Sequence, residues 1–409
     1  MANEGVSRKF LTAAACSGAF VYGVVIILIG VTLGAFAERL SMPGATLGFY
    51  FFFFLNIGVF IAFFAVGPLI DRIGKKAVLV IGTFIVGVCM ILAGISQSYQ
   101  MICLWMFLLG AGAAGINGGG NTLVNDLYPE NPSKALNLVN IFFSFGFVAL
   151  PLIASWLMVN LGLTALMIVA AVLCFVPTVL YGINKFPPPT MGSAFKLNEA
   201  GKAVSEPLVI LLALVLFCYI GLEVSTSGWT RSFLEAEHGI GTSSALLALA
   251  GFGVAMMIGR LVAGTVLSGV KATKMVLGSS LLAAVSLAIF ISAQSVWLAL
   301  IALWLVGAFY GPIFPSSLGT AGISFTRYVG TIFSLCIGIG VLGSVILAPA
   351  IGKVAQGSGL QAGLWLAFAT AVVMAILQIF VMIRARKFEK PATAPAAPAE
   401  SEATASPAE

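Results

Sequence analysis

Apolar segments long enough to cross a membrane recur twelve times along this chain of 409 residues. A bilayer has a hydrocarbon core about 30 Å thick, and a helix needs about 20 apolar residues to span it. The chain is 60% hydrophobic and 8% charged, whereas soluble domains carry about 25% charged residues. The pattern therefore predicts an all-α polytopic membrane protein. The expected segments are 10–36, 46–70, 76–96, 100–125, 134–158, 161–183, 207–234, 242–268, 273–293, 296–322, 327–354 and 359–385.

A polar stretch at 184–206, which includes three consecutive prolines, divides these segments into two sets of six. We therefore expect an N-terminal bundle over 1–183, a linker over 184–206 and a C-terminal bundle over 207–390. Residues 391–409 are rich in Ala, Pro, Ser and Glu and show no apolar periodicity. That composition predicts a disordered tail.

Basic residues are distributed unevenly between the two sides of the predicted membrane. Only Arg39, Arg231 and Lys353 fall on one side. Loops rich in Lys and Arg remain in the cytoplasm, so both termini and the linker are expected there, in a protein of the cell inner membrane. The net charge of +6 then reflects topology and predicts no nucleic-acid partner. The cytoplasmic set is Arg8, Lys9, Arg72, Lys75, Lys76, Lys134, Lys185, Lys196, Lys202, Lys271, Lys274, Arg327, Arg384, Arg386, Lys387 and Lys390.

The turn between the second and third segments is short and charged, with the sequence Gly67-Pro68-Leu69-Ile70-Asp71-Arg72-Ile73-Gly74-Lys75-Lys76. A related stretch ends the eighth segment, and aligning Gly264 with Gly67 places Ser268 where Asp71 stands. Such a repeat predicts two pseudo-symmetric six-helix bundles around a site near the midplane. The pattern of the first turn resembles the signature between helices 2 and 3 of the major facilitator superfamily of secondary transporters.

Asparagines gather on the fourth and fifth segments. Asn117, Asn121 and Asn125 are spaced by four residues, so they share one face of a helix, and Asn137 and Asn140 enter the membrane at a comparable depth. Amides both donate and accept hydrogen bonds, which suits hydroxyl groups better than anions. We expect Asn117, Asn121 and Asn140 to bind substrate, with Asn125 and Asn137 nearer the surface. The alternative is that the amides only tie the two helices together.

Glu223 is the one acid that the pattern places well inside a membrane segment. A carboxylate there needs a partner, a proton or a cation. It is expected to bind a coupling cation or substrate hydroxyls, with Tyr219 one turn away in the same site. The alternative is a structural carboxylate bonded to neighbouring Ser, Thr or backbone groups.

The tenth segment carries two prolines, two glycines and three aromatic residues between Gly307 and Pro315. This predicts a bent helix beside a cavity. Tyr310 and Phe309 are candidate wall residues for a sugar, unless they are core aromatics. Arg260, near the cytoplasmic end of its segment, is expected to bond helix-end carbonyls as part of a gate, although it could bind an anion.

Four stretches resemble the fucose permease and sodium-dependent glucose transporter-like branch of the superfamily. They are Asn117 to Glu130, Leu136 to Gly146, Tyr219 to Val224, and Phe314-Pro315. The resemblance implies a monosaccharide substrate taken up with a cation.

Two departures from the fucose permease pattern concern its acids. Its helix 4 glutamate matches Asn117 here, and its helix 1 aspartate has no acidic counterpart. Its helix 5 glutamine matches Asn140, which is still an amide. The resemblance therefore implies that coupling has moved to Glu223, with Na⁺ or H⁺, or that the protein is a facilitator.

The charged turn also suggests a conformational latch. Asp126 is expected to pair with Arg72, and Asp71 to cap the start of the eleventh segment near Arg327, where the helix dipole favours negative charge. Together with Arg260, these contacts would hold the cytoplasmic ends of the bundles together and stabilise an outward-open state.

The sequence thus predicts a non-enzymatic secondary transporter that moves a monosaccharide by alternating access. The alternatives are an exporter of drugs or metabolites, with a larger aromatic cavity, and an organic-anion antiporter, with basic residues at the midplane. No catalytic residue, metal site or cofactor is expected beyond a coupling Na⁺ or H⁺. The expected partners are the sugar and the lipid bilayer, and the expected state is a monomer.

Overall fold

The computed structural model describes residues 7–42, 44–188 and 196–388, and these residues form helices without strands. The predicted tail at 391–409 lies outside the described residues. The first bundle contains α1 (Arg8–Leu40), α2 (Gly44–Ile73), α3 (Lys75–Ile95), α4 (Tyr99–Leu127) and α5 (Pro132–Ile183). The second contains α7 (Pro207–His238), α8 (Thr242–Gly264), α9 (Ala272–Ser292), α10 (Val296–Tyr310), α11 (Ile313–Ser324), α12 (Val329–Ser358) and α13 (Leu360–Ala385), with a 3₁₀ turn at Arg386–Phe388.

Twelve stretches of the described chain are long and apolar enough to cross a membrane, which confirms the predicted number of spans. Helix α5 supplies two of them, because it breaks at Gly162, whose φ of 78° is not helical. Helices α10 and α11 together supply one, since the chain is interrupted at Gly311 and Pro312. The predicted bend in this segment is therefore confirmed.

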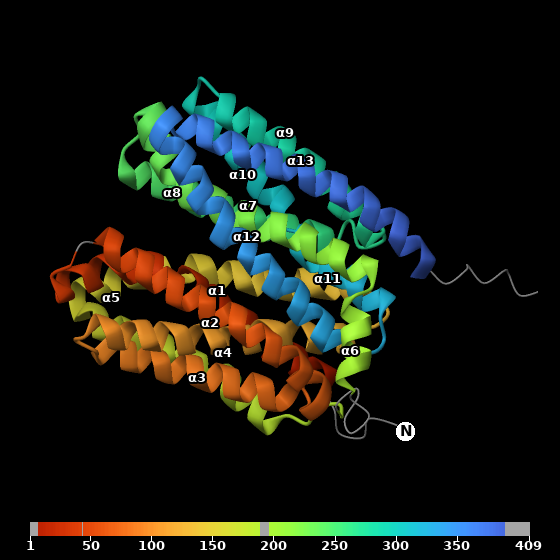
Figure 1. The fold of residues 1–409 in the computed structure, drawn as a ribbon. Coiled ribbons are helices and arrows are strands. Elements are labelled where there is room, and N and C mark those ends of the chain that lie inside the picture. The colour runs from red at the N-terminus through yellow and green to blue at the C-terminus, as the bar shows by residue number, and fades with distance from the viewer. Residues whose placement is uncertain (1–6, 43, 189–195, 389–409) are drawn as a thin grey trace, which may run out of the picture.

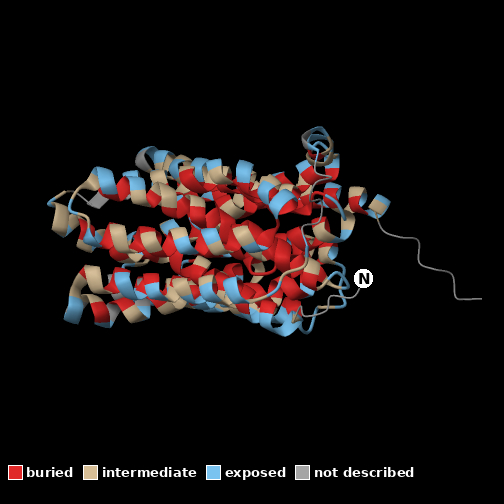
Figure 2. Ribbon diagram, turned by 90° about the horizontal axis from the view of Figure 1, so that it is seen from below, coloured by how far each residue is buried: buried red, intermediate tan, exposed pale blue. Residues whose placement is uncertain are grey.

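The two bundles lie side by side, and the start of α1 and the end of α13 lie at the same face of the molecule (Figure 1). We call this the N-terminal face. Figure 2 shows buried residues concentrated where helices meet. Many outward-facing side chains are nevertheless large and apolar, for example Phe64 and Trp297. This is expected of a protein whose surroundings are lipid rather than water.

Hydrogen bonds join the bundles at the N-terminal face. The Asp71 carboxylate accepts from the backbone N–H of Gly330 at 3.1 Å, and from the N–H and hydroxyl of Thr331 at 2.8 and 2.7 Å. These groups open α12, so the predicted cap by Asp71 is confirmed. Ser133 Oγ lies 3.2 Å from Ser316 Oγ on the other bundle.

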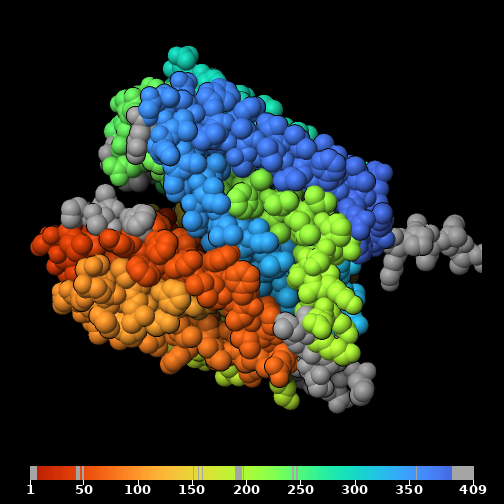
Figure 3. Space-filling model, viewed as in Figure 1, coloured from red at the N-terminus to blue at the C-terminus, as the bar shows by residue number. Residues whose placement is uncertain are grey.

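The bundles approach even more closely at Gly319 of α11. A Cβ atom at this position would lie 2.6 Å from the Ser133 Cα of α5. Real Cβ atoms do not come so near, so only glycine allows this contact. On the opposite face the bundles diverge, and Figure 3 shows a hollow between them. The molecule is therefore closed at the N-terminal face and open at the other.

The linker contains a short helix that the sequence did not predict, α6 (Leu197–Val204). The Tyr328 hydroxyl donates to the Glu199 carboxylate at 2.9 Å, and Ala200 packs with Tyr328. The hydrogen bond from Tyr328, together with Lys196, lowers the pKa of Glu199. Helix α6 is thus attached to the start of α12 at the N-terminal face.

One predicted latch contact is wrong. Asp126 pairs not with Arg72 but with Lys75, whose Nζ lies 2.5 Å from Asp126 Oδ2. The Lys75 side chain is only 2% exposed, whereas Arg72 is exposed. The chain turns at Gly74, so α3 begins with Lys75 directed toward α4, and the pair stabilises the first bundle internally.

Lys75→Gln is therefore expected to lower the free energy of unfolding by about 2 kcal/mol, because it leaves the Asp126 carboxylate, which is one quarter exposed, without its cation. Thermal melting of the detergent-solubilised protein measures the loss. Arg72→Gln is the matched control and is expected to have little effect. Asp126→Asn in the Lys75→Gln background is expected to restore part of the stability. Equal effects of Lys75→Gln and Arg72→Gln would contradict the assignment.

Candidate functional site

A cavity lies between the two bundles, about midway along their helices. The space within it that protein atoms do not fill is about 970 Å³, a figure that includes open solvent. Its polar lining residues are Tyr22, Asn56, Asn117, Asn140, Ser144, Glu223, Ser227, Arg260 and Ser344. Both bundles therefore contribute hydrogen-bonding groups.

Asparagine side chains form a connected row on the wall of the first bundle. Asn121 Nδ2 donates to Asn117 Oδ1 at 2.5 Å, and Asn140 Nδ2 donates to Asn121 Oδ1 at 3.3 Å. Asn117 and Asn140 line the cavity, whereas Asn121 lies behind them beside a smaller adjoining cavity. The amides therefore bond to one another and also present polar atoms to a ligand.

The two outer asparagines belong to the closed face instead. Asn137 Nδ2 donates to the Ser133 carbonyl at 2.8 Å and to Ser316 Oγ, on the other bundle, at 3.0 Å. Asn125 lies against Gly322 of α11. Neither residue lines the cavity, which agrees with their expected place nearer the membrane surface.

Glu223 of α7 faces the cavity from the second bundle and is half-buried. Within the described chain, no Lys or Arg nitrogen comes within 4 Å of its carboxylate. Arg260 of the same bundle lines the cavity with it. A carboxylate that lines a cavity without a direct ion pair can accept a proton, a cation or a substrate hydroxyl.

Arg260 of α8 is 2% exposed and crosses from the second bundle to the first. Its Nε donates to the Gly311 carbonyl at 3.1 Å. This carbonyl would bond the N–H four residues later in a helix, but that residue is Pro315, which has no N–H. Arg260 therefore satisfies a buried carbonyl that the break between α10 and α11 leaves open.

The Nη1 atom of the Arg260 guanidinium group contacts α5. This nitrogen donates to the Asn140 carbonyl at 3.0 Å and to Ser144 Oγ at 2.7 Å, and the guanidinium carbon lies 5.0 Å from the centre of the Phe143 ring. The bond to Gly311, at the end of α10, is the predicted contact with a helix-end carbonyl, whereas Asn140 and Ser144 lie within α5. Arg260 also lines the cavity, so one residue belongs to both the closed face and the site.

Two predicted wall residues lie behind the wall. Tyr219 and Tyr310 are fully buried, and neither lines the cavity. Their rings are 6.0 Å apart in a T-shaped arrangement, and they pack at 6.2 Å against Phe314 and Phe252, respectively. Phe314 and Phe252 form the apolar wall, while the tyrosines hold these rings in place.

Sequence reasoning missed five polar residues of the cavity lining, Tyr22, Asn56, Ser144, Ser227 and Ser344. Helix α1 is apolar on nearly every side, so periodicity gave no indication of the face that Tyr22 occupies. Glu223 lines the cavity from the second bundle, and Tyr22 lines it from the first together with Asn117. Its position as a tyrosine in the middle of an apolar segment was the one available signal.

Comparisons with known proteins agree with this architecture. The family model described as Major Facilitator Superfamily matches residues 15–335. A protein TsgA homolog of Yersinia enterocolitica is 23% identical over 288 residues, covering 67% of this chain and 70% of its own. The E. coli fucose:proton symporter FucP, in the outward conformation, superposes with a TM-score of 0.80 at 20% identity over 90% of this chain and 98% of FucP. The human organic anion transporter MFSD10 gives 0.75 at 15% identity, over 91% of this chain and 99% of MFSD10. From its twelve spans, its two bundles and the family match, this chain belongs to the Major Facilitator Superfamily.

Proposed function

We propose that the protein takes up a monosaccharide coupled to the entry of Na⁺ or H⁺. The observation that carries this proposal is the composition of the cavity, in which neutral amides of one bundle face a single carboxylate of the other. Amides and a carboxylate bond sugar hydroxyls, and the rings of Phe252 and Phe314 offer apolar faces to a sugar ring. The likeness to FucP supports the same substrate class.

Each group then has a distinct role. Asn117 and Asn140 bind substrate hydroxyls, and Asn121 orients these two amides through its hydrogen bonds to them. Glu223 binds the coupling cation. Arg260 closes the base of the site, and Tyr219 and Tyr310 support the aromatic wall.

The orientation belongs to the same proposal. The basic residues of the N-terminal face favour a cytoplasmic position for it in the inner membrane. The hollow of Figure 3 then faces outward, and the latch residues Asp71 and Arg260 stabilise the outward-open state. The protein would function as a monomer, because each chain contains both walls of the site.

A second candidate function is the exchange of organic anions. It is favoured by the Arg260 guanidinium at the cavity and by the likeness to MFSD10. Glu223 opposes it, because a nearby carboxylate repels an anion. Thermal-shift screening of the purified protein against sugars and organic anions, with and without Na⁺, distinguishes the two.

Asn117→Leu is expected to weaken binding of the identified sugar about tenfold, because a ligand hydroxyl loses a hydrogen bond in a site shielded from water. Isothermal titration or concentration-dependent uptake into proteoliposomes measures the change. The control is Asn160→Leu, an exposed asparagine that bonds its own helix. Stabilisation by anions alone, unchanged by Asn117→Leu, would reject the sugar proposal.

A further inference from the structure

A groove separate from the central cavity follows α1 on the outside of the first bundle. Its floor is made of small side chains, and its sides are made of large apolar ones from both halves of α5. The lining residues are Lys9, Thr12, Ala13, Cys16, Ser17, Phe20, Tyr128, Phe142, Phe145, Leu173 and Val176. Phe142, Phe145 and Val176 are exposed, so the groove opens toward the surrounding lipid.

The length of the groove corresponds to one leaflet of a membrane. Along α1 it extends from Lys9, at the N-terminal face, to Phe20. A rise of about 1.5 Å per residue makes this about 16 Å, or half of a hydrocarbon core about 30 Å thick. Phe20 and Phe145 close its inner end with ring centres 5.8 Å apart. One acyl chain that starts at the membrane surface therefore fits the groove along its whole length.

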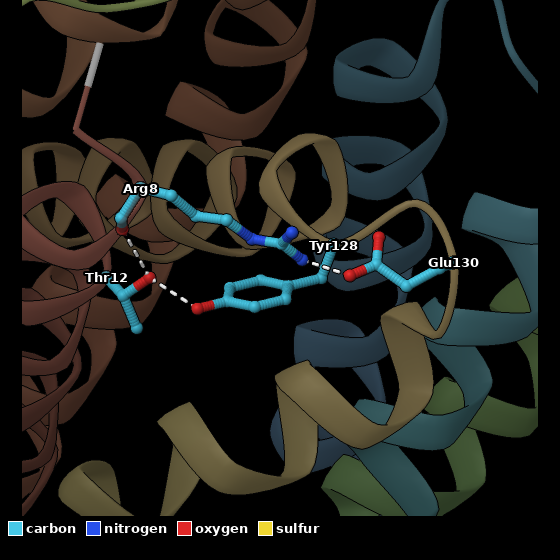
Figure 4. Close-up of polar contacts among 4 residues, drawn as sticks. All are labelled: Arg8, Thr12, Tyr128 and Glu130. Atoms are coloured by element: carbon cyan, nitrogen blue, oxygen red, sulfur yellow. Dashed lines mark hydrogen bonds and ion pairs between the residues drawn. The ribbon is translucent and has the colours of Figure 1, made fainter.

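The outer end of the groove has a fixed rim, shown in Figure 4. Arg8 pairs with Glu130, and its guanidinium carbon lies 3.9 Å from the centre of the Tyr128 ring. Thr12 Oγ1 lies 2.8 Å from the Tyr128 hydroxyl. The bond from Arg8 lowers the pKa of Glu130. The charge of Arg8 is thus matched by a carboxylate. The Tyr128 ring is fixed by Arg8 at its face and by Thr12 at its hydroxyl.

Two lysines remain at this rim with their charges unmatched. Lys9 flanks the groove, and Lys134 flanks a second depression that shares Thr12 and Tyr128 with it. Both lysines are exposed. In the part of the chain that the structure describes, neither is within 4 Å of an acidic oxygen. Because the charges of Arg8 and Glu130 cancel, the described residues of the rim carry a net charge of +2, from Lys9 and Lys134.

We propose that this groove binds an anionic phospholipid, with one acyl chain along α1 and the phosphate between Lys9 and Lys134. A zwitterionic lipid supplies the same chain but no net charge to meet the lysines. Basic pockets between membrane helices select anionic headgroups, each basic residue contributing about 1 kcal/mol. Two lysines therefore favour an anionic lipid on the order of 30-fold.

Native mass spectrometry of the full chain, loaded with equal amounts of phosphatidylglycerol and phosphatidylcholine, tests the proposal. One phosphatidylglycerol is expected to remain bound, with a preference on the order of 30-fold. The Lys9→Gln/Lys134→Gln variant is expected to lose the preference. The matched control is Lys202→Gln/Lys274→Gln, which removes two exposed lysines of α6 and α9 and is expected to keep it.

Ala13→Phe distinguishes binding in the groove from a general attraction of anionic lipid to the lysines. The substitution fills the exposed floor of the groove and leaves both lysines in place. It is expected to reduce retention of both lipids. Cys16 gives a second readout in liposomes, because it is the one half-buried cysteine of six and the other five are buried. Phosphatidylglycerol is expected to slow its alkylation by maleimide, and the double lysine variant to restore the rate. The proposal is overturned if the double lysine variant keeps the preference for phosphatidylglycerol. It is also overturned if native mass spectrometry shows a dimer of the chain without bound lipid.

Discussion

Glu223→Gln is expected to abolish accumulation of the substrate against its gradient, bringing the ratio of internal to external substrate from well above one to about one. Glutamine keeps the size of the side chain and one oxygen acceptor, but it carries no charge, so it takes up no proton and attracts a cation far less than a carboxylate does. Substrate can still bind and the bundles can still move. Exchange of labelled for unlabelled substrate across the membrane is therefore expected to stay within about threefold of the native rate.

The measurement is uptake into proteoliposomes under an imposed Na⁺ gradient and, separately, an imposed H⁺ gradient. The gradient that drives accumulation by the native protein identifies the ion. Glu237→Gln is the control, since Glu237 is an exposed acid on the same helix. Undiminished accumulation in Glu223→Gln under both gradients would remove Glu223 from the coupling mechanism.

Gly319→Val is expected to drive the protein out of the observed state. A side chain at this position collides with the Ser133 backbone of the other bundle, with the nearest atoms at 2.6 and 2.8 Å from Cβ. The three nearest atoms all belong to Ser133 of the first bundle. The valine therefore clashes with the first bundle and not with the second bundle, to which Gly319 belongs. The N-terminal face must then separate, which breaks the bonds from Asp71 to Gly330 and Thr331.

Spin labels at Lys134 and Lys274, both exposed at the N-terminal face, report this separation in a Cys16→Ala background. The native protein is expected to give one short distance, and Gly319→Val a longer one in most molecules. Gly278→Val is the control, because a Cβ there meets nothing within 4 Å. An unchanged distance distribution in Gly319→Val would mean that the bundles do not need this close approach.

The spans could be predicted because lipid imposes a length on every crossing helix. The rotation of each helix about its axis could not, because α1, α7 and α10 are apolar toward lipid and toward protein alike. This is why Tyr22 was missed, and why Tyr219 and Tyr310 were placed at the cavity instead of behind it. The asparagines of α4 and α5 were found because several amides gather there in otherwise apolar segments, whereas Asn56 stands alone among the phenylalanines of α2 and was missed.

The latch illustrates the same limit at shorter range. Asp71 could be assigned to the start of α12, because a carboxylate at a helix N-terminus has a defined partner. The partner of Asp126 could not, because Arg72 and Lys75 are both basic and close in sequence. Only the path of the chain through Gly74 decides which of them turns inward. For Arg260, a bond to a helix-end carbonyl could be predicted, but not which carbonyl, because Pro315 of a distant segment makes the Gly311 carbonyl available.

The hydrogen bonds of Asp71 have a consequence for an empty carrier. They exist only while the N-terminal face is closed, and the corresponding position of the second half is Ser268, whose carbonyl accepts one neutral bond from Asn131 at 3.1 Å. Hydrogen bonds to a charged group contribute about 1.5–3 kcal/mol each, and about 2.8 kcal/mol is a hundredfold difference in population. Without cargo, these bonds favour the state that is closed at the N-terminal face. Under the proposed coupling to an ion, this bias makes futile cycling of the empty carrier rarer, and turnover waits for a solute that binds the reoriented state more tightly.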